Sequence, residues 1–162
     1  MDGDLSLTAD GSMLGFMAGF PDSPYGPRNV WVLPTNSPGG PLTSHAHKVL
    51  HLRTGVFRVF LSNTGSHMYV ETLLAPRGGA VVLSLYSTTR GKRIRLLGRT
   101  GPGGWHRSEL SVTPDASGKH LLIFGYFASH RMAEMNLATG HLISITTTQP
   151  PVLDGGQTSA AW

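Results

Sequence analysis

The sequence predicts an all-β protein built from three repeated units of four antiparallel strands. Segments that read as a strand, a tight turn and a second strand recur at nearly equal spacing. The 162 residues include 21 glycines and 11 prolines, about one residue in five, which is typical of a chain with many turns. No long stretch carries apolar residues at the helical period without glycine or proline inside it, so we expect little or no helix.

Three glycines mark the same turn in the three units. Gly11, Gly65 and Gly118 are 54 and 53 residues apart, and the third unit carries two extra residues before its glycine. Each turn follows a short strand in which apolar and small polar residues alternate. We expect the apolar side chains of these strands to point inward and the polar ones outward. The apolar pairs are Leu5 and Leu7, Val59 and Leu61, and Leu110 and Val112.

The other three strands of each unit follow in order. Each second strand is apolar on both faces, which indicates that both of its faces are covered. The second strands are Leu14–Ala18, Met68–Val70 and Leu121–Phe127. The third strands are Asn29–Leu33, Val81–Tyr86 and Arg131–Leu137. The fourth strands are Lys48–Leu52, Arg93–Leu97 and His141–Ile145, after turns at 37–40, 89–92 and 138–140.

Repeated four-stranded units of this length are typical of the blades of β-propellers. The segments Leu5–Gly11 and Leu110–Asp115 resemble the Leu-Ser-x-Ser-Pro-Asp-Gly opening of WD-repeat-like and TolB-like blades. The segment Met135–Gly140 resembles the Asp-Leu-x-Thr-Gly turn between the outer strands of those blades. Unlike true WD repeats, the chain has no Trp-Asp dipeptide, and no Gly-His pair precedes a blade. Its composition is similar to that of propeller-like regions in actinobacterial proteins.

The resemblance implies three propeller-like blades that form a partial or self-completing β-propeller, and the function of a binding scaffold. Propellers usually have four to eight blades, so three blades leave two broad apolar faces open for a partner. Three arrangements stay open. The chain is a piece of a longer propeller, it pairs with a copy of itself into a six-bladed ring, or it forms a compact irregular β fold. The segment Ser159–Trp162 resembles the first strand of another blade.

Length and composition predict a single β-repeat domain over residues 1–162, with units at roughly 1–54, 55–107 and 108–162. The chain has no cysteine, which excludes a disulfide scaffold and thiolate chemistry. The stretch Leu121–Ala128 is too short to cross a bilayer, and the acidic start lacks the apolar core of a signal peptide. We expect a soluble chain without membrane insertion, cytoplasmic unless it belongs to a longer membrane-anchored protein.

Two clusters of polar residues are candidate ligand sites. In a strand, His45, His47 and His51 would point to one face, as zinc ligands do, but no acidic residue nearby would orient their rings. We therefore predict no metal site and no cofactor. His67 and His120 follow equivalent turns, which indicates a structural role.

The second cluster holds five basic residues between Arg90 and Arg99. Strand alternation predicts Arg93 and Arg95 on one face with Leu97, and Ile94 and Leu96 on the other. Such a stripe could bind the phosphates of a nucleic acid, and the formal net charge of +4 favours the binding of anions weakly. However, no aromatic residue lies between the basic residues to stack on bases. We expect a charged outer strand that resists edge pairing, and no nucleic-acid partner.

The sequence predicts no catalytic residue. The loop Gly101–Trp105 lacks the Lys-Ser/Thr pair of a phosphate-binding loop, and no Gly-x-Ser-x-Gly nucleophile elbow is present. Asp10 and Asp115 lie in turns, where aspartate side chains accept backbone hydrogen bonds. Glu71 interrupts an apolar strand and is the most prominent acid, but a single acid does not make a hydrolase.

The sequence therefore predicts a non-catalytic scaffold for protein–protein interaction, with a protein partner or a second copy bound through open blade faces or a loop-rich face. Two alternatives remain. One is a hydrolase with its site in the central channel of a completed ring. The other is a weak polyanion binder that uses residues 90–99.

Overall fold

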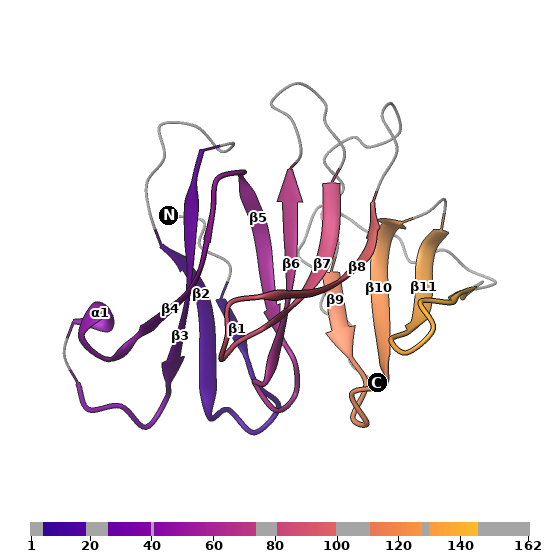
Figure 1. Ribbon diagram of the computed structural model, residues 1–162. Helices are drawn as coiled ribbons and strands as arrows, with labels where there is room; N and C mark the ends of the chain where they lie inside the picture. The colour runs from indigo at the N-terminus through magenta and orange to yellow at the C-terminus, as the bar shows by residue number, and fades with distance from the viewer. Residues whose placement is uncertain are drawn as a thin grey trace, which may run out of the picture. The chain divides into compact units, whose positions relative to one another are not determined.

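The computed structural model describes residues 5–18, 26–39, 41–73, 81–99, 111–127 and 130–145. The chain divides into two compact units, residues 1–103 and 104–162. The first unit contains two four-stranded antiparallel sheets, and the second contains one (Figure 1). The predicted all-β fold of three four-stranded antiparallel sheets is thus confirmed, whereas the single domain stays a prediction.

The first sheet has the strand order β1-β2-β3-β4. Its strands are β1 (Leu5–Leu7), β2 (Met13–Ala18), β3 (Arg28–Pro34) and β4 (His47–Leu52). A four-residue helix, α1 (Leu42–His45), precedes β4. In the described ranges α1 is the single helix, in agreement with the prediction from composition.

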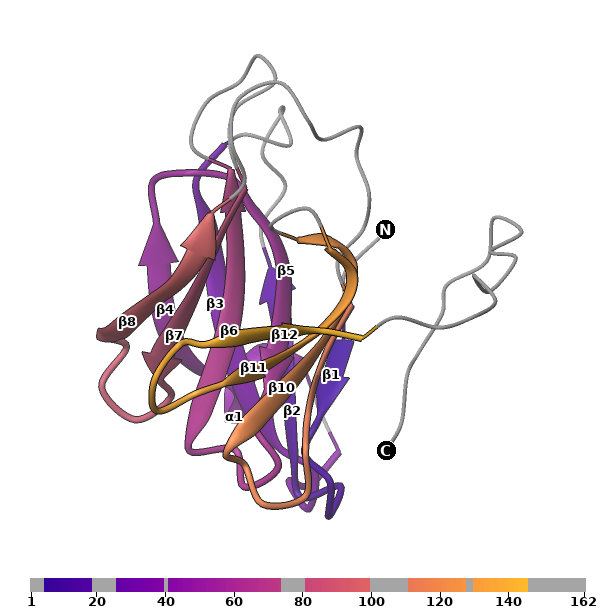
Figure 2. The ribbon, with the colours of Figure 1, turned by 90° about the vertical axis from the view of Figure 1, so that its right-hand side faces the viewer.

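The second and third sheets have the same up-and-down order. The second contains β5 (Val56–Leu61), β6 (His67–Leu73), β7 (Val81–Ser87) and β8 (Arg93–Arg99). The third contains β9 (Ser111–Pro114), β10 (His120–Phe127), β11 (His130–Asn136) and β12 (Leu142–Ser144), and β10 to β12 can be followed in Figure 2. As predicted, the second strand of the second sheet is covered on both faces, since Met68, Tyr69 and Val70 are all buried.

The turn between the first two strands has the same hydrogen bonds in all three sheets. Gly11, Gly65 and Gly118 have φ angles of 68°, 70° and 67°, a region that glycine adopts without steric cost. Three residues before each glycine, a side-chain oxygen accepts a hydrogen bond from the backbone N–H at the start of the next strand. The acceptor and donor residues are Thr8 and Met13, Ser62 and His67, and Asp115 and His120, at 3.0, 3.1 and 3.0 Å.

This pattern corrects the predicted alignment of the third unit. Asp115 stands three residues before its glycine, as Thr8 does, so no extra residues precede Gly118. Alignment by residue type instead matches Asp115 with Asp10, because both are aspartates just before a turn glycine. The turn requires a side-chain oxygen at this place, which threonine, serine and aspartate all supply.

The turns between the third and fourth strands are also as predicted in the second and third sheets. Gly91 and Gly140 have φ angles of 59° and 76°. The Gly91 N–H donates to the Ser87 carbonyl at 3.0 Å, and the Gly140 N–H donates to the Asn136 carbonyl at 2.7 Å. In the first sheet the connection passes through α1 instead.

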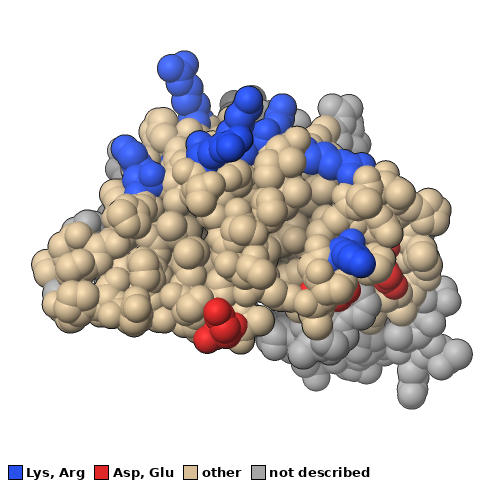
Figure 3. Space-filling view, turned by 60° about the horizontal axis from the view of Figure 1, so that its bottom comes forward, with Lys and Arg blue, Asp and Glu red and all other residues tan. Residues whose placement is uncertain are grey.

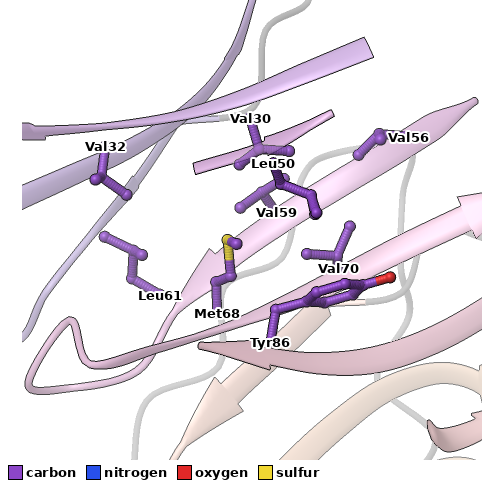
Figure 4. Close-up of a cluster of buried hydrophobic side chains, with 9 residues drawn as sticks. All are labelled: Val30, Val32, Leu50, Val56, Val59, Leu61, Met68, Val70 and Tyr86. Atoms are coloured by element: carbon purple, nitrogen blue, oxygen red, sulfur yellow. The ribbon is translucent and has the colours of Figure 1, made fainter. Parts of the chain in front are cut away.

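The two sheets of the first unit pack face to face around one core. In the second sheet we call face A the side that carries Leu61, Met68, Val70 and Tyr86, and face B the opposite side. In the other sheets, face A is the side that carries the repeat-equivalent residues. Face A of the second sheet covers face B of the first, which contributes residues such as Val30 (Figure 4). The core residues are Val30, Val32, Leu50, Val56, Val59, Leu61, Met68, Val70 and Tyr86.

Close contacts fix how these two sheets fit. A Cβ placed on Gly15, on face B of the first sheet, would lie 3.0 to 3.3 Å from three side-chain carbons of Leu61. The backbone N–H of Leu61 donates to the Ser6 hydroxyl oxygen at 2.8 Å. A glycine on one sheet thus makes room for a leucine on the next.

Candidate functional site

Two large apolar side chains of β1 are exposed on face A of the first sheet. Leu5 is 69% exposed and Leu7 is 58% exposed. The prediction that these leucines point inward is wrong, because the second sheet covers the opposite face, where Ser6 lies. The alternation itself is as predicted, but its apolar side is the uncovered one.

Three of the four repeat-equivalent residues in the other two sheets are buried. Measured from the turn, Leu5 and Leu7 correspond to Val59 and Leu61, which are 1% and 3% exposed. In the third sheet Leu5 corresponds to Val112, which is 4% exposed. The position of Leu5 is therefore a core position in both other sheets and that of Leu7 in the second sheet, whereas Pro114, the equivalent of Leu7 in the third sheet, is partly exposed.

The neighbouring strands continue face A with apolar residues that are half-buried or, in the case of Phe16, buried. Directly paired residues of an antiparallel sheet point to the same face. The register pairs β1 with β2 and β2 with β3, so that Leu5, Phe16 and Trp31 form one row and Leu7, Leu14 and Leu33 form the next. Lys48 lies opposite Trp31, is exposed and adds a positive charge at the outer strand. An apolar face with a charged margin is typical of a protein interaction site.

The histidine cluster does not assemble. His45 ends α1, and a β-bulge at Val49 in β4 breaks the alternation of the strand. His47 consequently pairs with Val32 on face B, whereas His51 pairs with Asn29 on face A, where its Nδ1 lies 2.9 Å from the Asn29 Oδ1. The prediction that the three histidines share a face is therefore wrong.

The basic strand β8 is also broken by bulges. Arg93 pairs with Tyr86 and Arg95 pairs with the adjacent Leu85, so the two arginines point to opposite faces, against the prediction. Burial raises the pKa of the Tyr86 hydroxyl, and the charge of Arg93 opposes that shift. Figure 3 shows that most Lys and Arg side chains drawn gather along one edge of that view. The bulges leave β8 without a continuous one-sided arginine stripe.

The two turn aspartates accept hydrogen bonds, as predicted. Asp10 accepts from the Thr8 hydroxyl at 2.7 Å and from the Ser12 N–H at 3.0 Å, and these bonds lower its pKa to about 2. For Asp115, burial acts to raise the pKa. Hydrogen bonds from Ser117, His120 and the Lys119 N–H outweigh burial and lower the pKa to about 2. Both carboxylates are structural.

Replacing Asp115 with asparagine should weaken the dependence of stability on pH in acid. The folded-state pKa of about 2 lies below the ordinary value of 3.8, so the carboxylate contributes stability above about pH 4 and loses it as the pH falls toward 2. Urea unfolding at a series of acidic pH values would measure the effect, with Asp10→Asn as the matched variant in the first sheet. Unchanged acid sensitivity in both variants would contradict these assignments.

The remaining polar candidates also have structural surroundings. His120 lies with Nδ1 3.5 Å from Asp115 and Nε2 3.8 Å from Glu134, and the Asn136 side-chain nitrogen is 3.2 Å from the same Nε2. Glu71 is 1% exposed and pairs with Arg58 on β5. A neighbour of opposite charge on the adjacent strand compensates a carboxylate in a sheet.

Within the described ranges, no three His, Cys, Asp or Glu side chains come together as a group able to hold a metal ion. The same ranges contain no helix with the length and hydropathy of a membrane span. The loop Gly101–Trp105, the segment Ser159–Trp162, and Asp2, Asp4, Asp22, Glu109 and Asp154 lie outside the described residues.

The sequence predicts open apolar faces but does not identify their residues. Leu5 and Leu7 carry the same alternating pattern as Val59 and Leu61, which are buried. The pattern alone does not say which sheet is left uncovered. Which sheet has an uncovered face A depends on how the sheets pack on one another, and this is a matter of tertiary structure.

Comparison with known proteins supports the fold. No protein-family model and no curated protein matches the chain. An uncharacterised protein of Listeria monocytogenes EGD-e is similar in structure, with a TM-score of 0.63 and 8% identity over 90% of this chain and 40% of that one. TolB of Acinetobacter baumannii, a β-propeller, has a TM-score of 0.59 and 10% identity over 89% of this chain and 32% of TolB.

A structure from a study of two prolyl endopeptidases has a TM-score of 0.51 and 17% identity, over 86% of this chain and 20% of that one. This chain thus spans less than half the length of each of these structures. At such low identities the likeness concerns the fold, which is all-β with propeller-like sheets.

Proposed function

We propose that this chain is a non-catalytic, propeller-like module that binds a protein through face A of its first sheet. The exposure of Leu5 and Leu7 supports the proposal, because their equivalents Val59 and Leu61 are core residues. Covering such side chains contributes about 25 cal/mol for each Å² of apolar surface removed from water. In the second sheet, the same face is covered by another sheet, the first one.

Two observations favour this function over the alternatives. For polyanion binding, Arg93 and Arg95 would have to act together, but they lie on opposite faces of β8. For hydrolysis, a nucleophile and a base would have to meet, whereas the described carboxylates of Asp10 and Asp115 accept turn hydrogen bonds. The apolar face needs no such assembly, because its residues already lie side by side in one sheet.

Photo-crosslinking in the cell of origin tests this function. A benzoylphenylalanine at position 7 should give a protein adduct on irradiation, because its ketone reacts with C–H bonds of whatever covers face A. The same residue at position 94 is the matched control, since Ile94 is 53% exposed on the outer strand β8. Failure to obtain an adduct at position 7, or identical adducts at both positions, would argue against a binding role for face A.

A further inference from the structure

We propose that the outer strands β4 and β8 of the first unit form a surface that binds an anionic lipid bilayer. The contact is with the surface of the bilayer and does not span it. It uses residues other than Leu5 and Leu7, so it goes beyond the proposed function and does not depend on it. We call the exposed basic residues of these strands and of the turns beside them the basic rim: Lys48, Arg53, Arg90, Lys92 and Arg93.

The two halves of the basic rim meet where Gly91 approaches Val49. The Val49 carbonyl oxygen leaves no room for a Cβ on Gly91, so the turn before β8 touches the bulge of β4. Lys92 follows Gly91 and Lys48 precedes Val49, which makes basic residues of two sheets neighbours along the backbone. Most Lys and Arg side chains drawn in Figure 3 gather along one edge of that view. The rim therefore does not require a one-sided arginine stripe on β8.

Acidic side chains do not balance this charge. In the described part of the first unit the acidic residues are Asp10 and Glu71. Glu71 is 1% exposed and pairs with Arg58, and Asp10 accepts hydrogen bonds in the turn between β1 and β2. Clusters of about four to eight basic residues are typical of proteins that bind anionic lipids, and the basic rim is of this size.

Two exposed apolar side chains lie in the same strand as part of the rim. Ile94 is 53% exposed and Leu96 is 50% exposed, and they alternate with Arg93 and the partly exposed Arg95. In the described part of the first unit, large apolar side chains are exposed on β1 and β8 alone. At a bilayer surface, such side chains are buried between the headgroups and the acyl chains. Strand β8 thus carries a group for each layer of a lipid surface.

The apolar residues favour a bilayer over a nucleic acid. The phosphates of a nucleic acid would attract the basic rim, but they would gain nothing from Ile94 and Leu96. Stacking on bases requires aromatic residues, and none lies between Arg90 and Arg99. Binding to an anionic bilayer, in contrast, becomes stronger with both the positive charge and the apolar area buried.

Co-sedimentation with vesicles measures the binding. Purified protein should sediment with vesicles of roughly one part phosphatidylserine to two parts phosphatidylcholine, and at least about tenfold more weakly with phosphatidylcholine alone. Lys92→Gln should weaken the binding about fivefold, the contribution of one basic residue near an anionic bilayer. Lys119→Gln is the matched control, because Lys119 is also exposed and also follows a turn glycine, but lies beside Asp115 in the third sheet. It should change the binding by less than about twofold.

A second pair of variants tests the apolar contribution. Ile94→Ser should weaken vesicle binding about tenfold, because it removes most of an apolar side chain from the interfacial layer. Ile143→Ser is the matched control, since Ile143 is also 53% exposed but pairs with the acidic Glu134 in the third sheet. All four substituted side chains are exposed, so the circular dichroism spectra of the variants should match that of the wild type.

Several results would overturn the lipid surface. Wild-type protein that does not sediment with the phosphatidylserine vesicles would do so, as would equal losses for Lys92→Gln and Lys119→Gln. Ile94→Ser protein that sediments like the wild type, or tighter binding of duplex DNA than of vesicles in fluorescence anisotropy, would indicate a nucleic-acid partner instead. None of these results concerns the photo-adduct at position 7, so the two proposals can fail separately.

Discussion

Replacing Gly91 with alanine should lower the free energy of unfolding of the first unit by about 3 kcal/mol or more. Gly91 has a φ of 59°, a conformation that costs other residues about 1 to 2 kcal/mol. A Cβ at this position would also lie 2.0 Å from the carbonyl oxygen of Val49. Because that atom belongs to the backbone, relief requires a shift of β4 or of the turn.

The carbonyl that an added Cβ would meet belongs to the bulged residue of β4. Val49 is the extra residue between the pairs Val30–Leu50 and Trp31–Lys48, and its carbonyl meets the turn that contains Gly91. Gly11→Ala is the matched control, since Gly11 has a φ of 68° and a Cβ added there would meet nothing within 4 Å. It should cost about 1 to 2 kcal/mol. Urea unfolding measures both, and equal losses would show that the contact with Val49 has no energetic effect.

Replacing Leu61 with alanine should cost about 3 kcal/mol, within the range of 2 to 5 kcal/mol for truncating a buried leucine. Leu61 is 3% exposed and packs between the two sheets of the first unit. Its truncation leaves a cavity on face B of the first sheet, beside Gly15. A loss of this size should appear as a lower urea midpoint with an unchanged slope.

The contact with Gly15 makes a double-mutant cycle informative. Gly15→Ala alone should cost about 1 kcal/mol, because its methyl group would lie 3.0 to 3.3 Å from the tip of Leu61. In the double variant with Leu61→Ala, those carbons are gone and the new methyl group partly fills the cavity. The combined loss should therefore be smaller than the sum of the single losses by more than about 0.5 kcal/mol. Additive losses would contradict the fit between these two residues.

The turns and strands were predictable because local chemistry determines them. A glycine with positive φ after a polar residue specifies the first turn of each sheet, as at Gly65. Alternating or continuous apolar residues then specify the strands on either side. The predicted third and fourth strands agree with the structure to within a residue or two at each end, as in Val81–Ser87 for β7.

The candidate sites were less predictable because they depend on register and tertiary packing. A bulge inserts one residue without a signal in composition, so Val49 reversed the expected face of His47 relative to His51. A bulge between Arg93 and Arg95 did the same for the basic strand. Residue type was also misleading at Asp115, whose equivalent in the first sheet is Thr8.

The bulges in β4 and β8 also bear on solubility. A flat outer strand offers a row of free N–H and C=O groups on which foreign strands can grow into amyloid-like aggregates. Here β4 is kinked once and β8 twice, Lys92 and Arg93 add exposed charges, and β12 is three residues long. Edge strands of this kind pair poorly with strands of other chains. Contacts between chains should therefore form through side chains on the face of a sheet.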